Sequence, residues 1–142
     1  MAFSDSKFWQ VDLTTRAGAK TGAYQASIVC LLMAVLSFLG LIFLGMGAGV
    51  GSLPATVLLL QSAQFVLFLV AGWQLRSGKG FYLGVVALAL LVLNLAGNVV
   101  SGAIGGAILN GVLILVLGNG LRGAKALMDN RGFEDDQLDV FN

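Results

Sequence analysis

The feature that most constrains this chain is a pair of long stretches without any formal charge. One lies between Lys20 and Arg76, and the other between Lys79 and Arg122. The chain has 142 residues, of which 11% are charged and 58% are apolar, whereas a soluble domain carries about 25% charged residues. Because the chain lacks the charge to cover a water-facing surface, we predict an integral membrane protein.

The charge-free stretches divide into four apolar segments, each long enough for a membrane-crossing helix. Such a helix needs about 20 apolar residues to cross a hydrocarbon core of ~30 Å. Membrane strands would instead alternate in polarity over about 10 residues. The short connections force neighbouring spans to be antiparallel, so we predict an all-α, four-helix up-down bundle in the membrane. The expected domains are an N-terminal cytoplasmic or interfacial segment 1–20, a transmembrane domain 21–121 with spans at about 21–45, 54–75, 80–100 and 103–121, and an acidic cytoplasmic tail 122–142.

The basic residues predict the orientation of these spans. Lys and Arg concentrate in cytoplasmic loops, and all eight lie before the first span, between the second and third, or after the fourth. Four antiparallel crossings place those three segments on one side, and the two loops on the other side carry no charge. We therefore expect both termini to be cytoplasmic. The residues expected to anchor this interface are Trp9, Tyr24, Trp73, Tyr82, Arg76, Lys79, Arg122 and Lys125.

Side chains suited to metal binding or catalysis are scarce in this sequence. The chain has no histidine, and Cys30 is its one cysteine. Zinc, haem and iron–sulfur sites rely on those residue types, and general acid–base catalysis needs a titratable group near the reacting atom. We therefore expect no metal, no cofactor, no nucleic-acid partner and no enzymatic activity. Cys30 is interpreted as a small apolar filler of the first span.

The polar residues inside the predicted spans are amides and hydroxyls. At 1.5 Å per residue, Gln61, Asn94 and Asn110 all lie about 10 Å below the outer hydrocarbon edge, and Gln64 follows one turn after Gln61. Amides at one depth predict a single polar layer. Three interpretations remain open: hydrogen bonds that hold helices together, the lining of a polar pocket or pore, or isolated amides that face lipid.

Glycines on the fourth span predict a close helix contact. Gly102, Gly106 and Asn110 are spaced four apart on the fourth span, so they share one face. A small-x-x-x-small pair such as Gly102 and Gly106 lets another helix approach closely, and Gly111 and Gly118 mark an adjoining stripe. The partner helix could belong to this chain or to another subunit.

The two ends of the chain allow two interpretations each. Segment 1–20 mixes aromatic and charged residues, as in an interfacial helix, but an ordinary flexible tail fits equally. The residues after Leu127 include five carboxylates and one arginine interleaved with apolar residues. Such a tail is either solvated or docked on a basic surface of a cytoplasmic partner.

The end of the fourth span reads Asn119-Gly120-Leu121-Arg122-Gly123-Ala124-Lys125-Ala126. It resembles the Asn-Gly-x-Arg-Gly ending of small four-span bacterial inner-membrane proteins, which are mostly of unassigned function. The resemblance covers this segment alone. It implies a bacterial inner membrane and transfers no active-site residue.

Small size, glycine-rich faces and short loops are typical of a non-enzymatic accessory or scaffold subunit. Such a subunit would pack against a larger membrane protein complex or against copies of itself. The alternative is a small channel or transporter for a neutral or small solute, with Gln64, Asn94 and Asn110 along its path. Ion-coupled carriers usually place charged residues inside the membrane, and these spans have none. The expected partners are the lipid bilayer, other membrane subunits or a second copy, and a cytoplasmic partner of the acidic tail.

Overall fold

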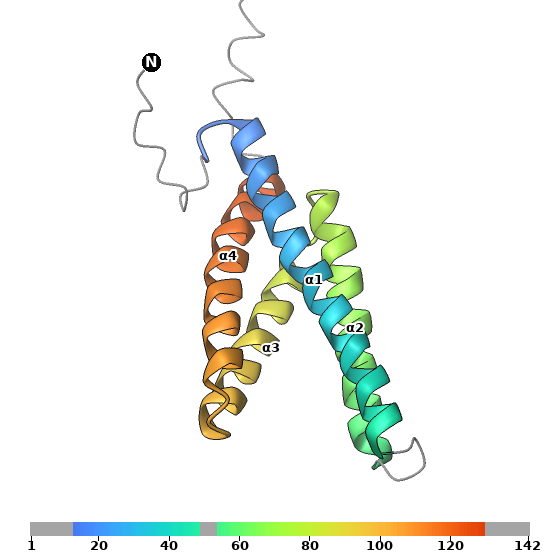
Figure 1. Ribbon diagram of the computed structural model, residues 1–142. Helices are drawn as coiled ribbons and strands as arrows, with labels where there is room; N and C mark the ends of the chain where they lie inside the picture. The colour runs from blue at the N-terminus through green and yellow to red at the C-terminus, as the bar shows by residue number, and fades with distance from the viewer. Residues whose placement is uncertain (1–12, 49–53, 130–142) are drawn as a thin grey trace, which may run out of the picture.

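The computed structural model describes residues 13–48 and 54–129, which form four helices (Figure 1). Each of the four helices is long and apolar enough to cross a membrane. The all-α class and the four candidate membrane spans predicted from the sequence are therefore confirmed. The helices are α1 (Arg16–Ala48), α2 (Ala55–Arg76), α3 (Phe81–Val100) and α4 (Ile104–Met128).

Two helices extend further than the sequence predicts. α1 begins at Arg16 rather than near residue 21, and α4 ends at Met128 rather than near residue 121. The two extensions support each other, because buried Ala19 and Ala126 form a small cluster. Part of the predicted N-terminal segment and part of the predicted tail therefore belong to helices. Residues 1–12, which include Trp9, lie outside the described residues, and so does the tail from residue 130 onward.

The α2–α3 and α3–α4 connections are tight turns, each built on a Ser-Gly pair. The hydroxyl groups of Ser77 and Ser101 each donate a hydrogen bond to the carbonyl oxygen three residues earlier, at 2.8 and 3.2 Å. The following glycines, Gly78 and Gly102, have positive φ values of 75° and 73°. A residue without a Cβ adopts this conformation readily at the end of a helix. Each turn therefore reverses the chain within a few residues.

The helices form two hairpins that converge at one end and diverge at the other, like an inverted V (Figure 1). α1 packs extensively against both α2 and α4, and α3 packs mainly against α4. α2 and α3 touch much less, although they are adjacent in sequence. The start of α1, the α2–α3 turn and the end of α4 meet at the convergent end. We call this end the basic end, since it carries Arg16, Lys20, Arg76, Lys79, Arg122 and Lys125.

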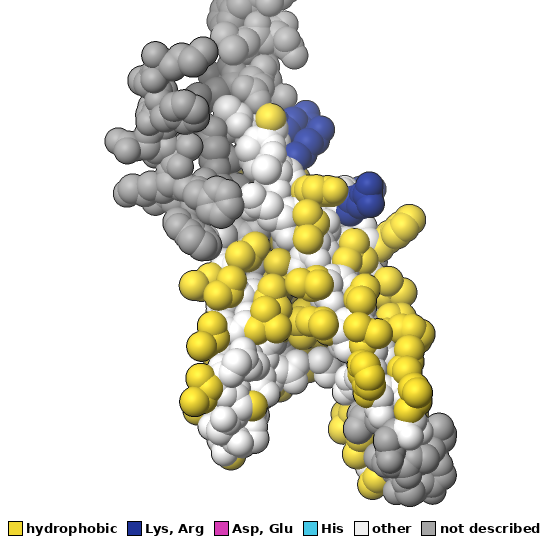
Figure 2. All heavy atoms as spheres, viewed as in Figure 1, with side chains coloured by type: hydrophobic (Ala, Val, Ile, Leu, Met, Phe, Trp, Pro, Cys, Tyr) yellow, Lys and Arg dark blue, Asp and Glu magenta, His cyan; other side chains and the backbone are white. Residues whose placement is uncertain are grey.

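The hydrophobic core lies toward the basic end. In α2 the buried residues, among them Phe68 and Leu75, lie in the half next to the α2–α3 turn, and in α3 they extend from that turn to Leu91 near the middle of the helix. Cys30 of α1 is fully buried in the same cluster, as expected for an apolar filler. Toward the opposite end the hairpins separate, and exposed apolar side chains lie along both legs (Figure 2). Such surfaces suit helices surrounded by lipid tails.

A close contact through small residues joins α1 to α4. A Cβ on Gly120 would lie 2.6 Å from the carbonyl oxygen of Gly22 and 2.6 Å from the Cβ of Ala26. A Cβ on Gly123 would lie 2.5 Å from the carbonyl oxygen of Ala19. Small residues let membrane helices approach this closely. The contact joins the two hairpins near the basic end.

The glycines predicted as a packing face occupy different surroundings. Gly102 lies in the turn before α4, which corrects the prediction that it shares a helical face with Gly106. A Cβ on Gly106 would lie 2.9 Å from the Asn98 side chain of α3. A Cβ on Gly111 or Gly118 would have no described atom within 4 Å, apart from the neighbouring backbone of its own helix. Of the four predicted glycines, only Gly106 therefore lies in a close helix contact within the described chain.

Candidate functional site: an amide-lined cleft

A cleft of about 400 Å³ lies between the two hairpins. Figure 2 shows the two legs separated by open space on the side away from the basic end. All four helices contribute polar side chains, and Met33 and Leu36 add apolar ones. We call this site the amide cleft; its polar lining is Ser37, Gln61, Gln64, Asn94, Asn98 and Asn110. The lining includes all four amides that the sequence singles out.

On one wall of the amide cleft, Gln61 links α2 to α1. Its side-chain Nε2 donates a hydrogen bond to the backbone carbonyl oxygen of Ser37, at 3.3 Å. Gly40 leaves room for this amide, because a Cβ on Gly40 would lie 3.1 Å from Nε2. Gln61 therefore forms a hydrogen bond that holds two helices together, which is the first of the three interpretations of the amides.

The other wall is formed by α3 and α4. Asn94 and Asn98 are four residues apart on α3, so they lie on one helical face, and Asn98 packs beside Gly106 of α4. Asn110 of α4 is only 6% exposed. Among the described residues, no side-chain N or O atom is buried without a hydrogen-bond partner. Each polar side-chain atom that lines the cleft therefore either makes a hydrogen bond within the protein or is exposed at the surface, where a ligand can reach it.

The lining determines which ligands the amide cleft can bind. An amide side chain offers both donors and an acceptor, whereas lipid tails offer neither. A polar group left unsatisfied in hydrocarbon costs several kcal/mol. No titratable side chain among the described residues lines the cleft. The site is therefore suited to neutral hydrogen-bonding groups, such as polar side chains of a helix, water or a small neutral solute.

The described interface residues gather at the basic end, away from the amide cleft. Trp73 and Tyr82 are 76% and 71% exposed, which suits aromatic anchors at a membrane interface. The guanidinium carbon of Arg76 lies 5.8 Å from the centre of the Tyr24 ring, within the range of a cation–π contact. Arg122 and Lys125 are exposed on the last turns of α4, as are Arg76 and Lys79 around the end of α2.

Two polar residues of the amide cleft, Asn98 and Ser37, were not predicted, nor were the apolar Met33 and Leu36. Asn98 could have been found, since it follows Asn94 by one helical turn. Ser37 gives no such signal, because serine hydroxyls are common in membrane helices and often bond to their own backbone. The small-residue contact of α1 was missed as well, although Ala19, Gly22, Ala23 and Ala26 repeat at helical spacing.

The Asn119–Ala126 segment, which carries the resemblance to small bacterial membrane proteins, contributes Gly120 and Gly123 to the α1–α4 contact. It contributes no side chain to the described lining of the amide cleft. Comparison of the chain with protein-family models, with curated proteins and with solved structures found no match.

Proposed function

We propose that this protein is a non-enzymatic accessory or scaffold subunit that holds a transmembrane helix of a larger membrane protein complex in the amide cleft. The observation that carries the proposal is the cleft itself, which is polar, neutral and open between two diverging hairpins. Lipid tails cannot bond to its amides, whereas a helix with polar side chains can.

The divergence of the two hairpins and the energetics of the polar lining favour a helix as the occupant of the cleft. A helix with its side chains is about 10–12 Å wide, so two hairpins must diverge to admit one. Interhelical hydrogen bonds in membranes contribute about 0.6 kcal/mol each. The amides would therefore select the partner and its register, while apolar packing on the legs would supply most of the affinity.

The proposal includes an orientation and a location. The four helices form an up-down bundle with the basic end and both termini in the cytoplasm of a bacterium, and the protein lies in the inner membrane. The orientation is supported by the basic residues, all eight of which belong to segments on one side of four crossings. The bacterial inner membrane is supported by the resemblance at Asn119–Ala126.

Site-specific photo-crosslinking in native membranes tests the scaffold function. A photoreactive residue at position 94 would project into the amide cleft, and one at position 93 serves as the control, because Leu93 is 66% exposed and does not line the cleft. We expect position 94 to crosslink to a transmembrane segment of one membrane protein, identified by mass spectrometry, and position 93 to crosslink mainly to lipid. A protein that purifies in mild detergent as a partner-free monomer, with no crosslink from position 94, would contradict the proposal. A crosslink to a second copy of this chain would assign the cleft to self-association instead.

A small channel or transporter for a neutral solute is the second candidate. The observation that favours it is that Gln64, Asn94 and Asn110 share one polar cavity. Purified protein in sealed vesicles would then accelerate the entry of water or of small neutral solutes such as glycerol. Permeability equal to that of protein-free vesicles would exclude this candidate for the solutes tested.

A further inference from the structure

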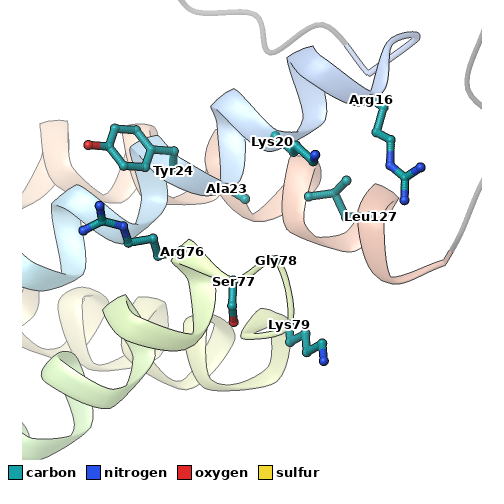
Figure 3. A pocket seen from close by; sticks show the side chains of 9 residues that line it. All are labelled: Arg16, Lys20, Ala23, Tyr24, Arg76, Ser77, Gly78, Lys79 and Leu127. Carbon is teal, nitrogen blue, oxygen red and sulfur yellow. The ribbon is translucent and has the colours of Figure 1, made fainter. Parts of the chain in front are cut away.

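A second cavity, of about 560 Å³, lies at the basic end between α1, the α2–α3 turn and the end of α4. Four basic side chains line it: Arg16 and Lys20 from α1, and Arg76 and Lys79 from the end of α2 and the turn that follows (Figure 3). No acidic side chain among the described residues lines it. We call this site the basic cavity; it is separate from the amide cleft, and the two share no lining residue.

Part of the basic cavity is apolar. Ala23 and Leu127 line it beside the cations, and the Tyr24 ring lies under the Arg76 guanidinium group. Exposed Trp73 belongs to the last turn of α2, just before Arg76. Aromatic side chains of this kind collect at the level of the lipid headgroups. The cavity therefore combines positive charge with apolar surface next to an exposed tryptophan, a combination that suits a lipid phosphate and the start of its acyl chains.

We propose that the basic cavity binds the phosphate group of an anionic phospholipid from the leaflet at the basic end. Lys20, Arg76 and Lys79 supply the positive charge, and the planar guanidinium group of Arg76 can donate two parallel hydrogen bonds to phosphate oxygens. Basic pockets between membrane helices are suited to anionic headgroups. The Ser77 hydroxyl, which also lines the cavity, already donates to the carbonyl oxygen of Gln74, so recognition depends on the cations.

The size of the cavity and its apolar lining favour a lipid over a free phosphate ion. Sites for whole organic ligands typically measure about 300–1,000 Å³, and this cavity falls within that range. A free ion would use only the cations, whereas the glycerol and upper acyl carbons of a lipid would also cover Ala23 and Leu127. Binding would join α1 to the α2–α3 turn at the place where the hairpins converge.

Native mass spectrometry of the full chain in detergent tests the proposal. The protein is titrated with phosphatidylglycerol, with phosphatidylcholine of the same acyl chains, and with inorganic phosphate. The cavity variant carries Arg76→Gln and Lys79→Gln. The matched control carries Arg122→Gln and Lys125→Gln, which remove the same charge from the same end without changing any residue that lines the cavity. Only residues that line the cavity can donate charge-assisted hydrogen bonds to a bound phosphate, and these bonds are stronger than the general attraction of a basic surface, so we expect the cavity variant to bind phosphatidylglycerol at least about 10-fold more weakly.

The proposal requires three results together: preference for phosphatidylglycerol over phosphatidylcholine, a large loss in the cavity variant, and a small loss in the control. An equal loss in both variants would overturn it, because the attraction would then belong to the whole basic end. Binding of inorganic phosphate as tight as that of the lipid would overturn the lipid assignment in favour of a soluble anion. If the double variant does not fold, Lys20→Gln on the opposite wall replaces it. Because Lys20 lines the cavity and can donate a charge-assisted hydrogen bond to the phosphate, this variant must weaken phosphatidylglycerol binding by about tenfold, more than the control does.

Discussion

Gly120 of α4 lies directly against the backbone of Gly22 of α1, so that a Cβ on Gly120 would lie 2.6 Å from the Gly22 carbonyl oxygen. The neighbouring atom belongs to the backbone, and it cannot move aside as the tip of a flexible side chain would. Any side chain at this position must therefore separate the two helices. Because α1 and α4 belong to different hairpins, this contact governs how the hairpins meet at the basic end.

Replacing this glycine tests the α1–α4 contact. We expect Gly120→Ala to lower the free energy of unfolding by about 1–3 kcal/mol, since overpacking forces the helices apart. Gly118→Ala, two residues earlier on the same helix, is the matched control, because no described atom outside the local helix lies within 4 Å of its Cβ position. Thermal unfolding in detergent, followed by circular dichroism, measures both variants. Equal stability of the two variants would show that the helices are not in close contact at Gly120.

The turn before α4 gives a second prediction. Gly102 has a φ of 73° and open space around it, so Gly102→Ala introduces backbone strain without a steric clash. We expect it to cost about 1 kcal/mol. Gly105→Ala, which also meets open space but lies within α4, should instead stabilise the helix by up to about 1 kcal/mol. Unfolding experiments measure the change in the free energy of unfolding for both variants. A decrease for Gly102→Ala with an increase for Gly105→Ala would confirm the turn conformation, and changes in the same direction would contradict it.

Gln61 and Gln64 line the same cleft but should differ in their effect on stability. Gln61 donates a hydrogen bond to the Ser37 carbonyl oxygen, so Gln61→Leu should lower the free energy of unfolding by about 0.6 kcal/mol. No side-chain hydrogen bond to another helix is described for Gln64, so Gln64→Leu should leave the stability of the isolated protein nearly unchanged. Titration with a denaturing detergent compares the two variants. A larger loss for Gln64 than for Gln61 would show that Gln64, and not Gln61, makes the stabilising contact between helices.

The scaffold function predicts that Asn94 matters for assembly more than for folding. We expect Asn94→Leu to reduce the amount of partner that co-purifies in mild detergent by several-fold, because the partner's polar groups would face an apolar side chain. Gln74→Leu removes an amide from an exposed position outside the amide cleft, and it should leave the amount of partner unchanged. Quantitative mass spectrometry of the purified complexes provides the measurement. Equal partner recovery with the two variants would argue against the cleft as the binding surface.

The amides of the site could be predicted from the sequence because a polar side chain inside a membrane span is energetically costly and therefore rare. A polar side chain in a long apolar run is conspicuous, so Gln61, Gln64, Asn94 and Asn110 could be identified without a structure, and one structural cleft collects all four. The glycine contacts were not predictable in the same way. Small residues occur throughout these helices. Gly120 and Ala124 form a small-x-x-x-small pair just as Gly102 and Gly106 do, so this pattern could not identify the pair that makes the contact.

The sequence by itself determined the number of membrane-length helices and the confinement of every charge to three segments. Both follow from a local rule, because a charge inside a hydrocarbon span is costly wherever it occurs. Only the tertiary structure decided that α1 packs against both α2 and α4, that the hairpins diverge, and that four cations surround one cavity. Lipid tails and leucine side chains are equally apolar, so hydropathy cannot choose between helix partners. That choice depends on the close fit of small residues such as Gly22 and Gly120, which exists only once the helices are packed.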